Sequence, residues 1–357
     1  MNARPVLIIA GGTGGHVFPA LAVAQVLVGR AVPVIWLGTP DGLEARVVPG
    51  AGLTLETVSV RGLRGNGLLG WFKAPWMVTR ALIQALAVIR RHRPRAVLGM
   101  GGYVAGPGGL AARLCRLPLV IHEQNAVAGL TNRLLSRLAT RVLTGLDASF
   151  GRGVDAEFTG NPVRAGIAGR PAAADERHDG PPRLLVIGGS LGALSLNRAV
   201  PAAVARLAVA DRPSIRHQAG RRTLDTARAA YAEADVDAQV EAFIDDMAEA
   251  YRWCDLVICR AGALTVSELA AAGVPAILVP FPHAVDDHQT ANAQFLVDAG
   301  GAERIADHDL DAPTLSAALS ALLDNRDRLR AMGSAARRVG RPAAAERVAD
   351  ICIEVAA

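Results

Sequence analysis

The first residue in the sequence that could transfer a proton is a histidine directly after a glycine-rich turn. The segment Gly11-Gly-Thr-Gly-Gly-His16 follows the apolar run Val6–Ala10, and a helical pattern starts at Val17. Such a turn lets a phosphate approach the backbone, and the helix N-terminus supplies free N–H groups. The same N-terminus should lower the pKa of His16, which favours a general base; capping of the helix is the alternative.

Two further loops are rich in glycine. Gly188-Gly-Ser-Leu-Gly192 follows the apolar run Arg183–Ile187, as the first loop follows its own strand. Neither Gly11–Gly15 nor Gly188–Gly192 has the GxGxxG or the GxxxxGK[ST] spacing, which disfavours NAD and Walker-type ATP chemistry. The segment Gly99–Gly109 holds more glycine than a tight turn needs, which predicts close approach of a ligand or of another backbone segment.

Several polar residues follow predicted strands. His122-Glu-Gln-Asn125 comes after the strand 119–121, where site residues are expected. Glu268 lies just inside a predicted helix, where its carboxylate could match the helix dipole or accept ribose hydroxyls. Arg164 could bind a phosphate or be an ordinary surface residue. The DxD-like segments, 235–237 and 307–311, look like helix-flanking acids, so we predict no metal site.

These loops require an α/β scaffold. Two strand–loop–helix openings lie half a chain apart, which predicts two doubly wound, Rossmann-like domains joined by a polar linker at 171–182. The predicted strands are 6–10, 32–37, 96–98, 119–121, 142–143, 183–187, 215–218, 240–243, 256–258 and 276–279. The predicted helices are 17–28, with Pro19 in its first turn, 78–93, 264–272 and a helical tail over 314–355.

Composition narrows the class of protein. The chain has 357 residues, of which 51% are hydrophobic and 20% charged, so two folded domains are expected. No segment resembles a membrane span or a signal peptide, so we expect a cytoplasmic location. The four cysteines show no zinc spacing and should be small buried residues. Residues 1–160 hold 17 Lys or Arg against 7 Asp or Glu, which suggests an anionic partner.

An aromatic and basic segment lies at 61–77. It combines apolar side chains with Arg61, Arg64 and Lys73, as an anchor on anionic lipid would. The candidate membrane residues are Leu68, Leu69, Trp71, Phe72, Lys73 and Trp76. A helix packed on the core is the alternative, but Gly65, Gly67 and Gly70 argue against a regular buried helix. The basic residues lack a nucleic-acid module signature, so we expect no nucleic-acid partner.

In order along the chain, these motifs resemble the MurG family of peptidoglycan N-acetylglucosaminyltransferases. The matching segments are 11–20, 99–109, 122–132, 160–164, 188–190, 243–247, 260–268 and 287–293. The resemblance implies a glycosyltransferase B-type fold: two Rossmann-like domains facing across a cleft. The implied domains are 1–163, joined by a C-terminal helix at about 341–357, and 164–340. The first would bind acceptor and membrane, and the second UDP-GlcNAc.

The resemblance also implies an activity and its substrates. GlcNAc would pass with inversion from UDP-GlcNAc to the 4-hydroxyl of lipid I, the lipid-linked muramyl-pentapeptide, to give lipid II. The protein would lie on the cytoplasmic face of the plasma (inner) membrane as a peripheral protein, with other cell-wall synthesis proteins as further partners. No cofactor is implied. A UDP-GlcNAc 2-epimerase and a non-catalytic UDP-sugar sensor are the alternatives.

By the same resemblance, the site residues can be assigned. Ile244 would contact uracil through its backbone, Glu268 would accept the ribose hydroxyls, and Gln289 with Asn292 would bind the sugar. The residues implied to bind UDP-GlcNAc are Thr13, Gly14, Gly15, Asn125, Arg164, Ser190, Ile244, Ala263, Leu264, Thr265, Val266, Ser267, Glu268, Gln289 and Asn292. His16 is the candidate base, with Glu123 second. Leu191 departs from the family's usual glutamine, so any polar role of that side chain is in doubt.

Overall fold

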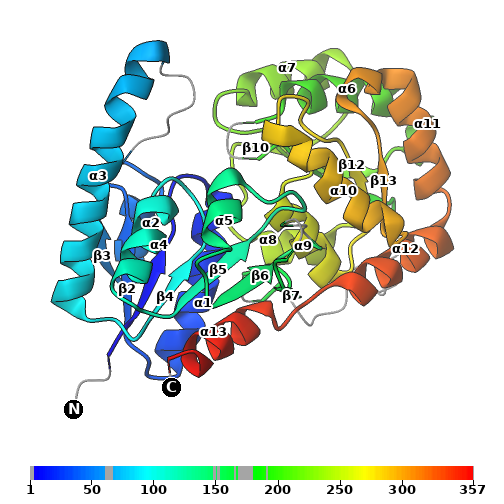
Figure 1. Cartoon of the computed structure of the whole chain (residues 1–357). Coiled ribbons are helices and arrows are strands. Elements are labelled where there is room, and N and C mark those ends of the chain that lie inside the picture. The colour runs from blue at the N-terminus through cyan, green and yellow to red at the C-terminus, as the bar shows by residue number, and fades with distance from the viewer. Residues whose placement is uncertain are drawn as a thin grey trace. The chain divides into compact units, whose positions relative to one another are not determined.

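The computed structural model divides the chain into two compact units. Unit 1 is 1–164 with 342–357, and unit 2 is 165–341. The residues described are 4–60, 67–147, 150, 153–164, 166–167, 180–189 and 192–356, without the side chains of 67–74 and 285. Most of the predicted linker 171–182 lies outside this description. Each unit is an α/β domain with its own parallel sheet, which confirms the predicted fold class (Figure 1).

Unit 1 is built on seven parallel strands in the order β3-β2-β1-β4-β5-β6-β7. The strands are β1 (Val6–Ile9), β2 (Val34–Gly38), β3 (Thr54–Thr57), β4 (Ala96–Gly99), β5 (Leu119–Glu123), β6 (Arg141–Thr144) and β7 (Ala156–Phe158). The helices are α1 (Gly14–Gly29), α2 (Glu44–Gly50), α3 (Gly67–His92), α4 (Ala105–Leu114), α5 (Leu130–Leu135) and α13 (Ala344–Glu354).

Strand alternation separates the two faces of this sheet. Val6 and Ile8 of β1 pack in the core that contains α1 and α13, whereas Leu7 and Ile9 pack in the core with α3 and α4. Although α13 follows unit 2 in the sequence, it lies beside α1 (Figure 1). An ion pair from Arg347 to Glu157, 2.8 Å long, adds to its apolar contacts.

Unit 2 has six parallel strands in the order β10-β9-β8-β11-β12-β13. They are β8 (Arg183–Ile187), β9 (Ser214–Gln218), β10 (Gln239–Glu241), β11 (Leu256–Cys259), β12 (Ala276–Leu278) and β13 (Ala302–Arg304). The helices are α6 (Leu194–Ala205), α7 (Leu224–Glu233), α8 (Met247–Trp253), α9 (Ala263–Ala272), α10 (His288–Asp298), α11 (Ala312–Leu323) and α12 (Arg326–Val339).

The strand order determines where ligands can bind. Both sheets reverse their order beside their first strand, between β1 and β4 and between β8 and β11. In open α/β sheets, ligands bind at the carboxyl ends of the strands at this switch point. The loops after β1 and β4, and those after β8 and β11, are therefore where the functional residues of each unit should be found.

Some predicted boundaries were wrong. Helix α1 starts at Gly14, so Pro19 lies beyond its first turn. Helix α3 already starts at Gly67 and includes Gly70, whereas the predicted helix began at residue 78. Strand β5 runs to Glu123 and so includes two residues that we assigned to the following loop. The helical tail is three helices, α11, α12 and α13, with a non-helical C-cap at Gly340.

Candidate functional site

The third glycine loop packs against the first one. A Cβ atom added to Gly102, which has φ +82°, would lie 2.2 Å from the carbonyl oxygen of Gly11. At Gly101, where φ is +100°, an added Cβ would lie 2.6 Å from Nδ1 of His16. Only glycine fits at either position. The density of glycine after β4 is thus explained by close approach of another backbone segment and of the His16 ring.

His16 lies in the first turn of α1, but it does not cap that helix. The N-cap is Thr13, which has extended backbone angles and makes no side-chain capping bond. The His16 ring instead faces the end of β5, where its Nδ1 is 2.9 Å from Oε1 of Gln124. The capping alternative for His16 is therefore wrong. Gly14 and Gly15 belong to the same turn and are partly exposed.

Glu123, the second candidate base, anchors the loop after β5. The side chain is buried, and Oε1 accepts hydrogen bonds from the backbone N–H and the side chain of Asn125, each 3.1 Å long. Its other oxygen, Oε2, accepts from the backbone of Gly129 at 3.0 Å and from the side chain of Asn132 at 2.9 Å. A carboxylate that accepts four hydrogen bonds from the protein is well suited to hold a loop.

Two other buried side chains hold the neighbouring backbone. His122 faces the carbonyl oxygen of Gly160 through Nε2 at 3.0 Å, and burial lowers its pKa to about 4. Glu44 is fully buried and accepts from the backbone N–H of Gly12 at 3.1 Å and of Thr39 at 2.8 Å. No local sequence pattern predicts that Glu44 holds the first glycine loop, because the residue that it binds, Gly12, is 32 residues away in the sequence.

Arg164 belongs to unit 1, whereas we expected it to begin the second domain. Its guanidinium lies over the ring of Phe18, 5.4 Å from the centroid. This cation–π contact places Arg164 against α1.

In unit 2, the N-terminal part of α9 carries most of the residues predicted to bind UDP-GlcNAc. The helix begins at Ala263 after an N-cap glycine, with no acidic residue in its first turn and no side-chain cap. Its first N–H groups and the positive end of its dipole suit an anion. Val266 and Ser267 are buried, and Leu264 and Thr265 are partly exposed. Glu268 is buried one turn further on, where Oε2 accepts a 3.1 Å bond from the hydroxyl of Tyr251.

The remaining predicted residues of unit 2 lie around this helix. Gln289, in the first turn of α10, accepts a 2.9 Å hydrogen bond from the backbone of Phe281. Asn292 is fully buried and donates a 3.1 Å bond to the carbonyl oxygen of Ala261, so it holds the loop before α9. Ile244 is buried shortly after β10.

The second glycine loop is held by a residue that we did not predict. Gln218 at the end of β9 bonds the backbone of Gly189 twice, accepting from its N–H and donating to its carbonyl oxygen, each at 3.1 Å. Ser190 and Leu191 lie outside the described residues, so their predicted roles remain predictions. A second missed cluster is Arg260, which pairs with Asp307 at 2.6 Å and donates to Ser195 at 2.7 Å.

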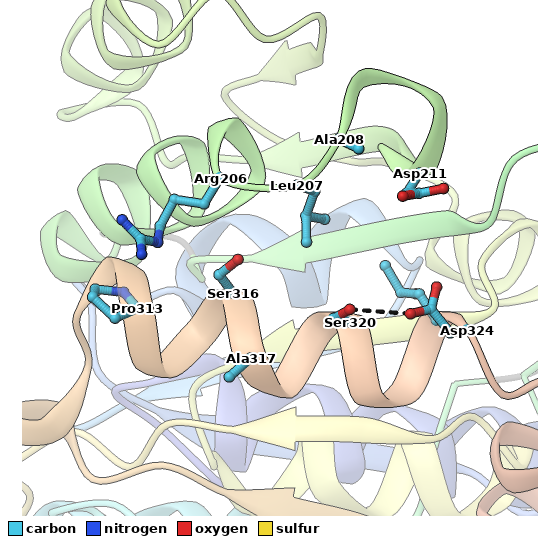
Figure 2. A pocket seen from close by; sticks show the side chains of 10 residues that line it. Arg206, Leu207, Ala208, Asp211, Pro313, Ser316, Ala317, Ser320 and Asp324 are labelled. Carbon is cyan, nitrogen blue, oxygen red and sulfur yellow. Dashed lines mark hydrogen bonds between the residues drawn. The ribbon is translucent and has the colours of Figure 1, made fainter.

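Two cavities are of interest. One, of about 480 Å³, lies in unit 1 beside the first glycine loop and is lined in part by Gly12, Trp76, Met77, Arg80 and Tyr103. The other, of about 360 Å³, lies in unit 2 between α11 and the connection from α6 to β9, with Ser316 and Ser320 on one wall (Figure 2). That connection leads to the amino end of β9, away from the edge where such sheets bind ligands.

Exposed apolar residues extend the predicted membrane segment. Trp76 is 68% exposed, and Ile83 on the same helix is 61% exposed. The side chains of Leu68, Leu69, Trp71, Phe72 and Lys73 lie outside the description, as do residues 61–66. Leu130 and Leu134 of α5, which were not among the predicted membrane residues, are 60% and 63% exposed.

These apolar side chains belong to a stretch of sequence that is rich in positive charge. Helices α3, α4 and α5 cover one face of the sheet in unit 1, and α4 contacts both of the others. Between Glu56 and Asp147 the sequence has 13 Lys or Arg residues and one acidic residue, the buried Glu123. Among the described residues, no helix is long and apolar enough to cross a membrane. Nor do they contain a group of three or more His, Cys, Asp or Glu able to hold a metal ion.

Comparison with known proteins agrees with this architecture. Residues 6–144 match the glycosyltransferase family 28 N-terminal domain, and residues 183–348 match the glycosyltransferase family 28 C-terminal domain. The fold and these matches define a two-domain glycosyltransferase. The chain belongs to glycosyltransferase family 28 and, within it, to the MurG family.

The relatives that support this are similar over their whole length. A protein of Alkalilimnicola ehrlichii is 62% identical, with 99% of each chain covered. One from Thiobacillus denitrificans is 55% identical, covering 98% of this chain and 97% of its own. Both are named UDP-N-acetylglucosamine–N-acetylmuramyl-(pentapeptide) pyrophosphoryl-undecaprenol N-acetylglucosamine transferase. The crystal structure of Acinetobacter baumannii MurG has a TM-score of 0.83 at 41% identity, covering 98% of this chain and 99% of its own.

Proposed function

We propose that this protein transfers GlcNAc from UDP-GlcNAc to the 4-hydroxyl of the muramyl sugar of lipid I, which gives lipid II for peptidoglycan synthesis. The observation that carries the proposal is the full-length identity to relatives named for this transfer. The described side chains include groups able to bind the donor, to bind the acceptor and to accept a proton.

Unit 2 binds the donor in this proposal. The Glu268 carboxylate accepts the ribose hydroxyls, with Tyr251 holding it at 3.1 Å. The N-terminus of α9 lies one turn before it and binds the diphosphate through free backbone N–H groups. Ile244 contacts the uracil through its backbone, and Gln289 binds the sugar. Asn292 acts on the site indirectly, because its amide nitrogen bonds the carbonyl oxygen of Ala261.

Unit 1 supplies the base and the acceptor site. His16 lies at the carboxyl end of β1, at the switch point of the sheet. The cavity of about 480 Å³ beside Gly11 and Gly12 of the same loop combines Arg80, which suits a diphosphate, with Trp76 and Met77, which suit a lipid chain. Glu123 is not our choice for the base, since its oxygens already accept four hydrogen bonds.

The reaction is a single displacement. The 4-hydroxyl oxygen of the acceptor attacks the anomeric carbon of GlcNAc as the bond to the UDP oxygen breaks, so the configuration inverts. His16 takes the hydroxyl proton, and the electron pair of the broken bond leaves with UDP. The positive end of the α9 dipole stabilises the negative charge that develops on the diphosphate, with Arg164 as a further cation.

We also propose that unit 1 binds an anionic membrane surface, at the cytoplasmic face of the inner membrane where lipid I would be presented. Support comes from the exposed apolar residues of α3 and α5, in a stretch of sequence with strong positive charge. Other cell-wall synthesis proteins are proposed as further partners.

Transfer of radiolabelled GlcNAc from UDP-GlcNAc to a short-chain lipid I analogue tests the function. Wild type should form labelled disaccharide-lipid. His16→Ala should lower kcat by about 10²–10⁴-fold, as expected for loss of a general base. Glu268→Ala should weaken UDP-GlcNAc binding, and the matched control His308→Ala, at an exposed histidine, should resemble wild type. UDP-GlcNAc binding by wild type without any transfer would contradict the proposal and favour an epimerase or a sensor.

A further inference from the structure

Gln124 lies between two histidines and two backbone carbonyl groups. Its Oε1 is 2.9 Å from Nδ1 of His16. Its Nε2 is 2.9 Å from the carbonyl oxygen of Met100, and 3.3 Å from both the carbonyl oxygen and Nδ1 of His122. The side chain is only 1% exposed, so water contributes little to its orientation.

These neighbours allow one orientation of the amide. Carbonyl oxygens only accept hydrogen bonds, so the group that faces Met100 O and His122 O must be the NH₂. The reverse orientation would place Oε1 against the oxygen of Met100, with no donor between them. The ring of His122 supports the same orientation of the amide. Nε2 of this neutral ring donates to the carbonyl oxygen of Gly160, so Nδ1 is left to accept a hydrogen bond from the NH₂ of Gln124.

The fixed amide then determines the proton on His16. Because Oε1 of Gln124 can only accept, Nδ1 of His16 must carry a hydrogen. In the neutral ring, the lone pair is therefore on Nε2. Nδ1, Cε1 and Cγ of the ring pack so closely on Gly101 that no Cβ fits there. Among the described residues, Nε2 of His16 has no hydrogen-bond partner.

We propose that Gln124 is a positioning residue that holds His16 in the Nδ1–H tautomer and directs Nε2 toward the acceptor hydroxyl. The inference rests on the proposed function, in which His16 is the base. In the reaction, the hydroxyl hydrogen moves to Nε2 and the ring becomes an imidazolium, while Nδ1–H remains bonded to Oε1. The amide orients the ring as the carboxylate does in a Ser-His-Asp triad, but without a negative charge.

The amide of Gln124, which is the partner of Nδ1 of His16, carries no charge. A carboxylate beside Nδ1 would favour the charged imidazolium and raise the pKa of His16. The other titratable side chain of this cluster is His122, whose burial keeps it neutral at physiological pH. An amide can therefore fix the tautomer without placing a negative charge beside the ring.

The test combines ¹⁵N NMR of histidine-labelled protein with transfer kinetics. The His16 signals are those absent from His16→Ala. We expect Nδ1 to be protonated in neutral wild-type His16 and this preference to be lost in Gln124→Met, which has similar size but no amide. We expect Gln124→Met to lower kcat by roughly 10–100-fold with an unchanged KM for UDP-GlcNAc.

Gln124→Glu gives a second measurement, which is useful if the methionine variant does not fold. A carboxylate at this position should move the acid limb of the pH–rate profile upward by about one unit or more. A purely structural glutamine would leave that limb unmoved.

The outcomes separate this inference from the proposed function. A protonated Nε2 in wild type, or wild-type kcat in Gln124→Met while His16→Ala is inactive, would overturn the positioning role and leave the transferase intact. Absence of transfer by wild type would contradict the proposed function, and the NMR spectrum would still decide the tautomer.

Discussion

The hydroxyl of Tyr251 donates a 3.1 Å hydrogen bond to Oε2 of Glu268, and both side chains are buried. Tyr251 is on α8 and Glu268 on α9, so two helices together orient the carboxylate that we assign to the ribose of UDP-GlcNAc. A hydrogen bond to a charged group contributes about 1.5–3 kcal/mol. Loss of the Tyr251 hydroxyl should weaken the binding of UDP-GlcNAc by only part of that energy, because the Glu268 carboxylate itself remains.

Tyr251→Phe should therefore raise KM for UDP-GlcNAc by roughly three- to tenfold with little change in kcat. Steady-state transfer kinetics at varied donor concentration measure this. Tyr231→Phe is a matched control, because Tyr231 is also buried and bonded to a side chain, that of His217 at 3.0 Å. An equal rise in KM in both variants would indicate a general effect on unit 2.

Gly102→Ala should disrupt the contact between the two glycine loops of unit 1. The new Cβ would lie 2.2 Å from the Gly11 oxygen, which is a backbone atom that cannot rotate away. Gly153→Ala is the control, since its φ of +84° is similar and nothing lies within 4 Å of the added Cβ. We expect the control to lose about 1–2 kcal/mol of unfolding free energy from backbone strain. Gly102→Ala should lose at least about 2 kcal/mol more in urea unfolding, and equal losses would contradict the close contact.

Glu123→Ala should destabilise unit 1, because it removes the carboxylate that accepts hydrogen bonds from the N–H of Gly129 and from the side chains of Asn125 and Asn132. The expected loss of unfolding free energy is about 3 kcal/mol by urea denaturation. Glu123→Gln should retain kcat within a few-fold, since the carboxylate is an anchor and not the base. A loss of 100-fold or more in kcat at unchanged stability would instead identify Glu123 as the base.

Removing apolar side chains from α5 should weaken membrane binding. Sedimentation with phosphatidylglycerol vesicles should show roughly tenfold weaker binding for the double variant Leu130→Ser with Leu134→Ser. Val209→Ser is the control, because this residue is 78% exposed but lies in unit 2. Thermal unfolding of the double variant should match wild type. Unchanged vesicle binding would exclude α5 from the membrane surface.

The buried histidines should make stability fall in acid. Burial lowers the pKa of His122 to about 4 and that of His217 to about 3, from an ordinary value of 6.5. Below pH 6.5 the unfolded chain therefore binds more protons, so the free energy of unfolding decreases as the pH falls toward these values. The expected loss is on the order of 3 kcal/mol per histidine. Urea unfolding at pH 7, 5 and 4 measures it, and His217→Gln should reduce the decline.

The sequence by itself determined the fold class and the positions of the functional loops. Apolar runs such as Val6–Ala10, each followed by a glycine turn and a helix, are local patterns, so they can be recognised without knowing any partner. The ordered motifs from Gly11 to Asn292 also identified the family, which the comparisons confirmed. Helix ends were less predictable: α3 begins at Gly67 although glycine has a low helix propensity, because propensity is only a weak guide to where a helix begins.

Only the tertiary structure decided how the side chains act. His16 and Gln124 are 108 residues apart in the sequence, and nothing near either one predicts their hydrogen bond. The tautomer of His16 and the anchoring role of Glu123 depend on which donors and acceptors the strands bring together. Parallel strands place the ends of β1, β4 and β5 side by side, and burial then requires each polar group there to find a partner. The motifs can be recognised from the sequence, but this requirement decides which of their polar groups donate and which accept hydrogen bonds.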